Sequence, residues 1–198
     1  MTKILIISAS YRSGGTIDQA IGVAAATARA AGAEIEVVQL RELPLKFCLN
    51  CRACTQAPGD APGRCVLPDD MPALLAKIEA ADALILASPT NFHTVTALFK
   101  RFMERLVVYA FWPWGAKAPQ ARKRSGNKRA VLLTSAAAPS FVGRWIFASL
   151  RQLGLAARTM GAKPVARVFI GMASMAPQAA LREADRSRIV QATHQLLA

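Results

Sequence analysis

Four cysteines in one irregular stretch are the residues of this chain best suited to metal or redox chemistry. Cys48, Cys51 and Cys54 follow one another at intervals of three residues, and Cys65 comes after ten further residues. This spacing places three thiolates around one point, which is typical of an iron-sulfur cubane that takes a distant cysteine as its fourth ligand. The candidate ligands of a 4Fe-4S cluster are therefore Cys48, Cys51, Cys54 and Cys65.

Three other interpretations of the cysteines stay open. Zinc accepts four thiolates, although structural zinc sites more often divide their cysteines into two pairs. Disulfides form in oxidising compartments, and nothing in the sequence indicates export to one. The thiols can also be vestigial, in which case the loop only shapes a substrate pocket.

A serine- and glycine-rich loop near the N-terminus is the second candidate site. It follows residues 4–7, a run of apolar residues typical of a strand buried on both faces, and it leads into an alanine-rich helical pattern. The loop amides and the positive end of the helix dipole favour an anion. The side chains that can donate to phosphate oxygens there are Ser8, Ser10, Arg12 and Thr16. The alternative is an ordinary helix start, with Thr16 and Gln19 as a capping box.

A third loop, with the sequence SPTNFH, follows the third apolar run of the chain. Pro89 is rigid, and Thr90 and Asn91 offer backbone amides and carbonyls. Phe92 adds an aromatic face. A planar ring system that is recognised by its polar edge needs groups of these kinds. The same stretch is also consistent with a plain helix start at Thr94.

Alternating apolar runs and amphipathic patterns predict the elements that position these loops. We expect strands at residues 4–7, 33–40, 83–87, 130–135 and 164–170. Helical spacing covers residues 16–31, 71–78, 95–106, 141–159 and 178–197. Such alternation predicts an α/β fold, a parallel sheet with helices on both faces, and a length of 198 residues is most simply one domain over residues 1–198.

The expected sheet brings the candidate loops together. In open parallel sheets, ligands bind at the carboxyl ends of the strands, where the strand order reverses. The loops at residues 8–16, 88–93 and 134–140 should therefore converge, and Ser88, Thr134 and Ser135 join the candidate ligand donors. The cysteine loop, residues 41–68, should lie beside them.

The positive charge of the chain is concentrated in one segment. The net charge is +13, and residues 105–182 contain thirteen Lys and Arg but no Asp or Glu. Such a field attracts a phosphorylated cofactor, an acidic redox protein or nucleic acid. No helix-turn-helix, zinc-finger or RNP pattern accompanies it, so nucleic acid is the least favoured partner. No stretch has the length of a membrane span or of a signal-peptide core, which makes a cytoplasmic protein the expectation.

The chain resembles the flavodoxin-like NAD(P)H-dependent FMN reductases, and within them the iron-sulfur flavoproteins. The resemblance lies in SASYRSGGT after the first strand, in the compact cysteine motif followed by CVLPDDM, and in SPTNF followed by TALFKRFMERL. It implies a flavodoxin-like, doubly wound, five-stranded parallel sheet in the order 2-1-3-4-5. It also implies bound FMN, electron transfer from a reduced nicotinamide or a redox protein, and a homodimer or homotetramer.

The resemblance assigns roles to particular residues. The FMN phosphate would be held by Ser10, Arg12, Gly15 and Thr16. The isoalloxazine would meet Pro89, Thr90, Asn91 and Phe92. Three features depart from the family pattern: the phosphate loop is one residue shorter, Asn91 replaces a frequent tyrosine, and the spacing before Cys65 is longer than usual. Trp112 and Trp114 are further candidates to close over the ring.

Three functions are compatible with these features. The leading hypothesis is an FMN-dependent oxidoreductase that takes a hydride from NAD(P)H and passes electrons to a quinone or another electron-deficient small molecule. Because the flavin carries the chemistry, no catalytic side chain is predicted. The second is an electron carrier with a 4Fe-4S cluster on the cysteine loop. The third is a basic, redox-sensing nucleic-acid-binding protein.

Overall fold

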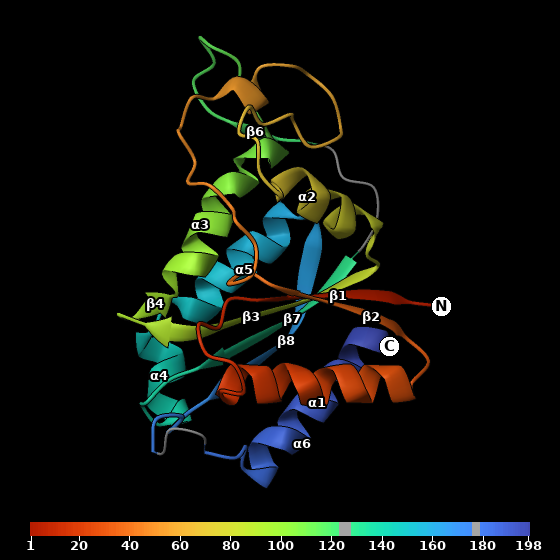
Figure 1. Cartoon of the computed structure of the whole chain (residues 1–198), viewed down its shortest axis with the longest axis vertical. Coiled ribbons are helices and arrows are strands. Elements are labelled where there is room, and N and C mark those ends of the chain that lie inside the picture. The colour runs from red at the N-terminus through yellow and green to blue at the C-terminus, as the bar shows by residue number, and fades with distance from the viewer. Residues whose placement is uncertain (123–127, 176–178) are drawn as a thin grey trace.

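A parallel sheet forms the centre of the computed structural model, which describes residues 1–122, 128–175 and 179–198 (Figure 1). Its strands follow the order β2-β1-β3-β7-β8, and every neighbouring pair along this path is parallel. The bounds are β1 Lys3–Ser8, β2 Glu34–Gln39, β3 Ala83–Asn91, β7 Lys128–Ser135 and β8 Ala162–Ile170. In chain order this path is 2-1-3-4-5, so the predicted sheet is confirmed.

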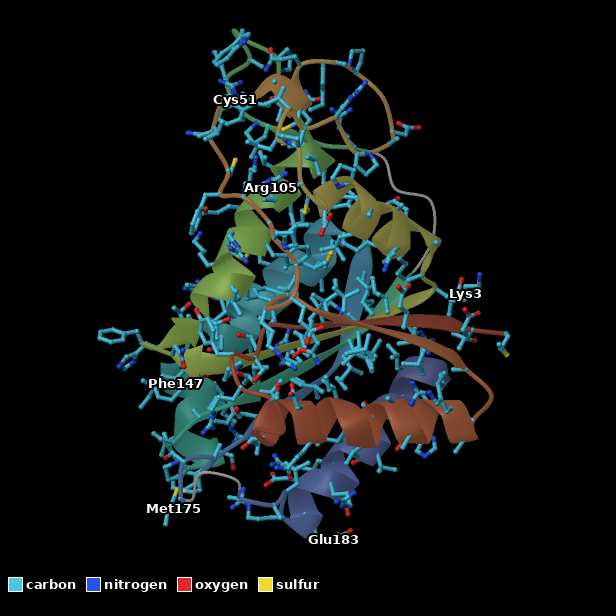
Figure 2. All side chains as sticks on the ribbon, in the orientation of Figure 1. Lys3, Cys51, Arg105, Phe147, Met175 and Glu183 are labelled. Atoms are coloured by element: carbon cyan, nitrogen blue, oxygen red, sulfur yellow. The ribbon has the colours of Figure 1, made fainter. Side chains whose placement is uncertain are left out.

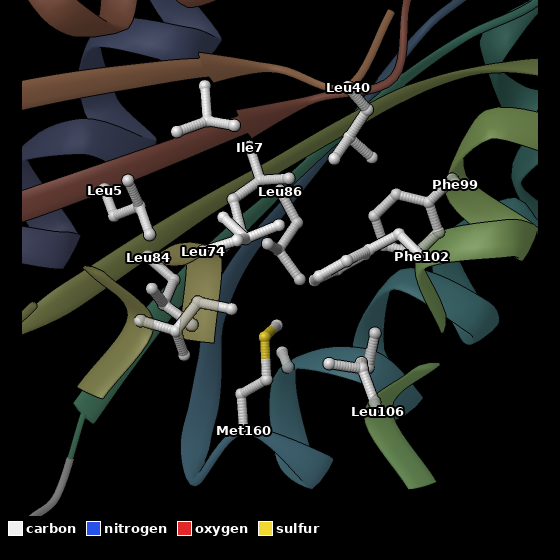
Figure 3. Packing of buried hydrophobic residues seen from close by; sticks show 14 of the residues in the cluster. Leu5, Ile7, Leu40, Leu74, Leu84, Leu86, Phe99, Phe102, Leu106 and Met160 are labelled. Carbon is white, nitrogen blue, oxygen red and sulfur yellow. The ribbon is translucent and has the colours of Figure 1, made fainter. Parts of the chain in front are cut away.

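Helices cover both faces of the sheet because its central strands are apolar on both sides. On one face, α1 (Thr16–Ala30) and α6 (Glu183–Leu197) pack against strand residues such as Ile4 and Ile85. On the other, α2 (Met71–Ala80), α3 (Ala97–Arg105) and α5 (Ser149–Thr159) pack against the alternate strand residues. Figure 3 shows this second core, in which Leu5, Ile7 and Leu86 meet Phe99, Phe102 and Met160.

The remaining elements are short. They are the 3-10 helices η1 (Ala53–Thr55) and η2 (Leu106–Tyr109), the strands β4 (Thr94–Val95), β5 (Ala110–Phe111) and β6 (Gln120–Ala121), and the helix α4 (Ser140–Ile146). β5 and β6 form a separate antiparallel pair, which the sequence pattern did not predict.

The predicted helix over residues 141–159 is wrong, because the structure has two helices there. Phe147 is extended, with φ −90° and ψ 139°, and separates α4 from α5. Its ring stacks on Phe169 at 6.2 Å and meets the His93 ring edge-on at 5.0 Å. The amide of Ala148 donates to the His93 carbonyl at 2.8 Å. These contacts with distant residues compensate for the break in the helix.

The start of the closing helix also differs from the sequence expectation. The closing helix was expected over residues 178–197, but α6 begins at Glu183. Gln178, the expected first residue of that helix, lies outside the described residues, as do Lys123 and Arg124 of the acid-free segment 105–182. Within the described part of the chain, no helix combines the length and the apolar character needed to cross a membrane.

Candidate functional site

A cavity of about 300 Å³ lies at the carboxyl edge of the sheet, where the loops after β1, β3 and β7 meet. Seven of the residues predicted to bind a cofactor line it: Ser10, Arg12, Gly15, Thr16, Pro89, Asn91 and Ser135. The other lining residues are Tyr11, Ile17 and Ala173. The expected convergence of the three loops is therefore present in the fold, and the cavity is called the edge pocket below.

The loop between β1 and α1 presents donors to the edge pocket. Gly14 has φ +71°, a left-handed conformation that favours glycine, and Gly15 is the N-cap of α1 without any side-chain cap. Most first-turn amides of a helix have no intrahelical partner, so they are free to bind an anion. The side chain of Arg12 folds over Gly15, its Nε lying 3.7 Å from where a Cβ on Gly15 would be. Backbone donors and one cation thus lie on the same side of the loop.

The carboxylate of Asp18, in the first turn of α1, is bound by other groups of the protein. It accepts from the Gly14 amide at 3.0 Å and pairs with Arg41 at 3.3 Å. The capping box of Thr16 and Gln19 is absent, because the Gln19 amide group instead donates to the carbonyls of Gly14 and Ala179. The carboxylate is neutralised locally, which leaves the helix end suited to an anionic ligand.

Three of the predicted binding residues lie behind the edge pocket. The Thr90 hydroxyl is 3.2 Å from that of Thr134 and 2.8 Å from that of Ser149. Thr134 also donates to the Ser88 carbonyl at 2.8 Å, and the Ser88 hydroxyl donates to the Pro89 carbonyl at 3.0 Å. Ser88 and Thr134 are fully buried. This hydroxyl network links the ends of β3 and β7.

Phe92 lies at the tip of a hairpin that the sequence pattern did not predict. β3 continues to Asn91 and pairs antiparallel with β4, and the turn residues Phe92 and His93 have φ 48° and 65°. Positive φ at both turn positions is typical of a two-residue type I′ turn, which normally uses asparagine and glycine. The Phe92 side chain is 100% exposed. The following helix is capped by Thr96, which accepts from the Phe99 amide at 3.2 Å, and not by Thr94.

The sequence reasoning missed the loop after β8. Ala173 lines the edge pocket, and its amide donates to the Ala136 carbonyl at 2.9 Å. Gly171 allows this close approach, since a Cβ there would lie 2.3 Å from the Ser140 amide nitrogen. The rule that ligands bind at the carboxyl ends of parallel strands applies to the fifth strand too, so it would have pointed to this loop.

The four cysteines line one small cavity at the far end of the molecule from α1 and α6. The cavity has a volume of about 20 Å³, and Arg105 also lines it. Figure 2 shows Cys51 on the outer loop, with Arg105 between that loop and the core. The amide of Asn50 donates to the Cys48 sulfur at 3.4 Å. All four cysteines are thus among the residues that line this cavity.

As folded, this cavity does not hold a metal site. Among the described residues, no three His, Cys, Asp or Glu side chains are close enough together to bind a metal ion. The volume is room for about one water molecule, so a cubane would require the loop to open. Burial, together with the neighbouring thiols of Cys65, Cys48 and Cys51, raises the pKa of Cys54. The cysteine side chains suit an iron-sulfur cluster, but the cavity between them is too small to hold one.

A buried ion pair anchors the cysteine loop to α3. Arg105 and Asp69 are both about 1% exposed, and two guanidinium nitrogens reach the carboxylate at 2.5 and 3.1 Å. Arg105 also donates to the Lys46 carbonyl at 2.8 Å and to the Cys65 sulfur at 3.4 Å. Asp69 accepts from the amides of Lys46 and Met71. One ion pair thus holds both ends of the loop.

The electrostatics of this pair favour the charged forms. Burial opposes both charges, but hydrogen bonds from Arg105 and from two amides outweigh it and keep the pKa of Asp69 below its ordinary value. The same contact raises the pKa of Arg105 against the opposing effect of burial. The pair is ionised throughout the neutral range.

Trp112 and Trp114 do not approach the edge pocket. The Arg52 guanidinium lies 3.7 Å from the ring centre of Trp112 and 4.3 Å from that of Trp114. Arg52 also donates to the Trp112 carbonyl at 2.7 Å. The two indoles therefore hold the cysteine loop, and the expectation that they close over a ring at the edge pocket is wrong.

The donor set of the edge pocket suits a phosphate, and a comparison with known families identifies the family of the chain. The sequence matches the family model of the NADPH-dependent FMN reductases over residues 2–182. The chain belongs to this family. The match covers nearly the whole chain.

Several relatives of this FMN reductase family member carry the name iron-sulfur flavoprotein. The chain is 33% identical over 111 residues to one from Archaeoglobus fulgidus, which covers 56% of this chain and 48% of that protein. It is 32% identical over 106 residues to one from Methanosarcina thermophila, which covers 54% of this chain and 53% of that protein. The chain thus matches about half the length of these curated relatives.

Solved structures of two other proteins share the fold of this chain. An NAD(P)H:quinone oxidoreductase from Methanothermobacter marburgensis superposes with a TM-score of 0.73 at 23% identity and covers 98% of both chains. An azoreductase from Bacillus anthracis superposes with a TM-score of 0.71 at 15% identity and covers 100% of both chains. These likenesses establish the flavodoxin-like architecture.

Proposed function

We propose that the protein is an FMN-dependent oxidoreductase that takes a hydride from NAD(P)H and passes electrons to a quinone or another electron-deficient small molecule. The observation that carries this proposal is the edge pocket. It combines a phosphate-type donor set on the loop after β1 with the Pro89 and Asn91 backbone on the neighbouring strand end. Family membership supports FMN as the ligand.

The residues of the edge pocket have separable tasks in this proposal. Ser10, Arg12, Gly15, Thr16 and the first-turn amides of α1 hold the FMN phosphate. Pro89 and Asn91 meet the ring edge, Ser135 borders the ring, and Phe92 on the hairpin tip can fold toward its open face. Ser88, Thr90 and Thr134 fix the relative positions of β3 and β7 through the hydroxyl network.

Bound FMN supplies the hydride and electron chemistry, and the protein supplies orientation. The residues that line the edge pocket include no carboxylate and no imidazole. We therefore assign no general acid or base among the described residues of the chain that line the pocket. The role of the chain is to bind the FMN phosphate, to leave one face of the flavin ring accessible to the substrates and to keep other molecules away from it.

The test is steady-state oxidation of NADPH and NADH with a soluble quinone. FMN-loaded protein should turn over with at least one of the two nucleotides, and protein stripped of flavin should not. Adding FMN back should restore the rate. A flavin-free preparation that is as active as the loaded protein would contradict the proposal.

The second candidate is an iron-sulfur electron carrier, which the cysteine loop supports. Four thiols share one cavity, an amide donates to the Cys48 sulfur, and a buried guanidinium contacts the Cys65 sulfur. Hydrogen bonds to sulfur are among the features that tune clusters. Protein purified without oxygen should then contain iron and acid-labile sulfide in equal amounts. Flavin absorption without iron would leave the oxidoreductase proposal standing and end this one.

The resemblance also leads us to propose a homodimer or homotetramer. Light scattering on FMN-loaded protein measures the assembly directly. A monomeric mass would contradict this part of the proposal.

A further inference from the structure

We propose that a groove along α4, α5 and β8 binds the adenosine 2′-phosphate end of NADPH and so makes the enzyme selective for NADPH over NADH. This inference rests on the proposed function, because it names the electron donor of the same reaction. We call the site the arginine groove. Its basic residues are Arg144, Arg151, Arg158, Arg167 and Arg188.

The arginine groove consists of two cavities that share part of their lining. Two cavities of about 500 and 470 Å³ adjoin each other and share Arg144, Trp145, Leu150 and Arg167 as lining residues. Each falls in the size range of small-molecule sites in proteins, which is roughly 300 to 1,000 Å³. The groove is large enough for a nucleotide.

The charge of the groove is uncompensated. Neither cavity has an aspartate or glutamate among its lining residues. In the described ranges, the guanidinium groups of Arg144, Arg151, Arg158 and Arg167 form no ion pair with a carboxylate. Arg188 is different, because it pairs with the buried carboxylate of Asp185 and also donates to the Phe169 carbonyl at 3.1 Å. Four exposed guanidinium groups are thus available to an anion.

Aromatic side chains beside these arginines favour a nucleotide over a simple anion. Trp145 is 80% exposed and Phe141 is 68% exposed, and both line the groove. The Arg144 guanidinium lies 5.6 Å from the Trp145 ring centre. Stacking of a base on an aromatic ring contributes roughly 1–3 kcal/mol, and arginine recognises phosphate through paired hydrogen bonds. An adenosine phosphate can make both interactions, because its adenine ring stacks on an aromatic side chain and its phosphate accepts hydrogen bonds from arginine.

The groove and the edge pocket include residues that lie close together along the chain. Ser135 lines the edge pocket and Ser140 lines the groove, so at most about 18 Å of chain separates them. The loops between the two sites are joined, since the Met172 amide donates to the Ala138 carbonyl at 3.1 Å and the Ala173 amide to the Ala136 carbonyl at 2.9 Å. An extended dinucleotide spans such a distance, with its nicotinamide at the edge pocket and its adenosine in the groove.

The kinetic test compares NADPH with NADH in Arg144→Ala and Arg167→Ala. We expect kcat/KM for NADPH to fall about 10- to 100-fold through KM, because a charge-assisted hydrogen bond contributes roughly 1.5–3 kcal/mol. The rate with NADH should stay within about twofold. The matched control is Lys163→Ala, which removes the same charge from β8 outside the groove and should leave both nucleotides unaffected.

Three results would overturn the inference. Wild-type protein without a preference for NADPH would do so, as would variants in which both nucleotides lose equally. An effect of Lys163→Ala as large as those of the groove variants would indicate a general field of positive charge. In each of these cases the oxidoreductase itself would still be active, so the proposed function would stand.

A binding measurement tests the groove without turnover. Calorimetry with adenosine 2′,5′-bisphosphate should show binding to the FMN-loaded wild type and weaker binding to Arg144→Ala, Arg167→Ala and Trp145→Ala. Inorganic phosphate should compete poorly. If phosphate competes as well as the bisphosphate, or if Trp145→Ala binds normally, the site attracts anions only and the inference fails.

Discussion

Arg12 and Thr16 are the residues on which phosphate binding in the edge pocket depends most directly. Arg12 brings a cation to the turn at Gly15, and Thr16 is the first residue of α1, where the helix dipole is positive. The pocket has no acidic lining residue, and Asp18 is already paired with Arg41. The local field at the loop is therefore favourable to a doubly charged phosphate.

Replacing Arg12 with alanine should weaken FMN binding about tenfold, which corresponds to about 1.4 kcal/mol. Thr16→Ala should have a smaller effect in the same direction, because a neutral donor contributes less than a charged one. The measurement is quenching of FMN fluorescence on titration with flavin-free protein. Arg29→Ala is the matched control, since Arg29 lies in the last turn of the same helix. If Arg12→Ala and Thr16→Ala both bind FMN with normal affinity, these two residues do not hold the phosphate.

At the scale of elements, the ion pair of Arg105 and Asp69 decides whether the cysteine loop is held in place. It joins the last turn of α3 to residues on both sides of the cysteine motif. Because both side chains are almost fully buried, loss of one partner leaves an uncompensated charge in the interior.

We expect Asp69→Asn or Arg105→Met to lower the free energy of unfolding by about 3–5 kcal/mol. Urea unfolding followed by circular dichroism measures the change. The control is Lys77→Met, which breaks the exposed pair with Glu36 and should cost at most about 1 kcal/mol. If breaking the two pairs lowers the free energy of unfolding equally, the cysteine loop does not depend on the buried pair.

The same pair predicts a pH dependence in acid. The pKa of Asp69 is lower in the folded protein than its ordinary value near 3.9. Its contribution to stability is therefore complete above about pH 4 and disappears as the pH falls through the folded pKa. The stability difference between wild type and Asp69→Asn should shrink over that acidic range. A difference that stays constant down to the acid transition would contradict the assigned role.

The elements also show which parts of the fold can be predicted from the sequence alone. Apolar runs predict the five parallel strands correctly, because strands that are buried on both faces consist mainly of branched apolar residues, whereas the strand order came from the family resemblance. The hairpin at Phe92 and His93 was missed because neither residue favours positive φ, and its turn is held by Ala148 from a distant segment. The break at Phe147 has no proline or glycine to mark it, since contacts with His93 and Phe169 compensate for it. Such tertiary contacts leave no local signal.

At the scale of the whole molecule, the two candidate sites were predicted with unequal success. The rule on carboxyl ends of strands brings together most residues of the edge pocket, and the structure adds Tyr11, Ile17 and Ala173. The four cysteines line one cavity, but among the described residues no three metal-binding side chains are close enough together to hold an ion. Spacing alone cannot show these distances.

The fold shows where the positive charges of the acid-free segment lie. The acid-free segment 105–182 contains Arg105, which is buried and paired, and four arginines of the arginine groove, which are exposed. A sequence count cannot separate these two groups, because burial and pairing depend on tertiary structure. The four exposed arginines line the groove, whereas Arg105 lines the cavity of the cysteines.

The most direct test of the central claim is anaerobic reduction of the FMN-loaded protein by NADPH. We predict that the visible flavin absorption disappears in proportion to the nucleotide added, that one NADPH reduces one FMN, and that a quinone added afterwards restores the oxidised spectrum. A protein that retains no FMN after purification and reconstitution, or whose bound FMN stays oxidised in excess NADPH and NADH, would contradict the account.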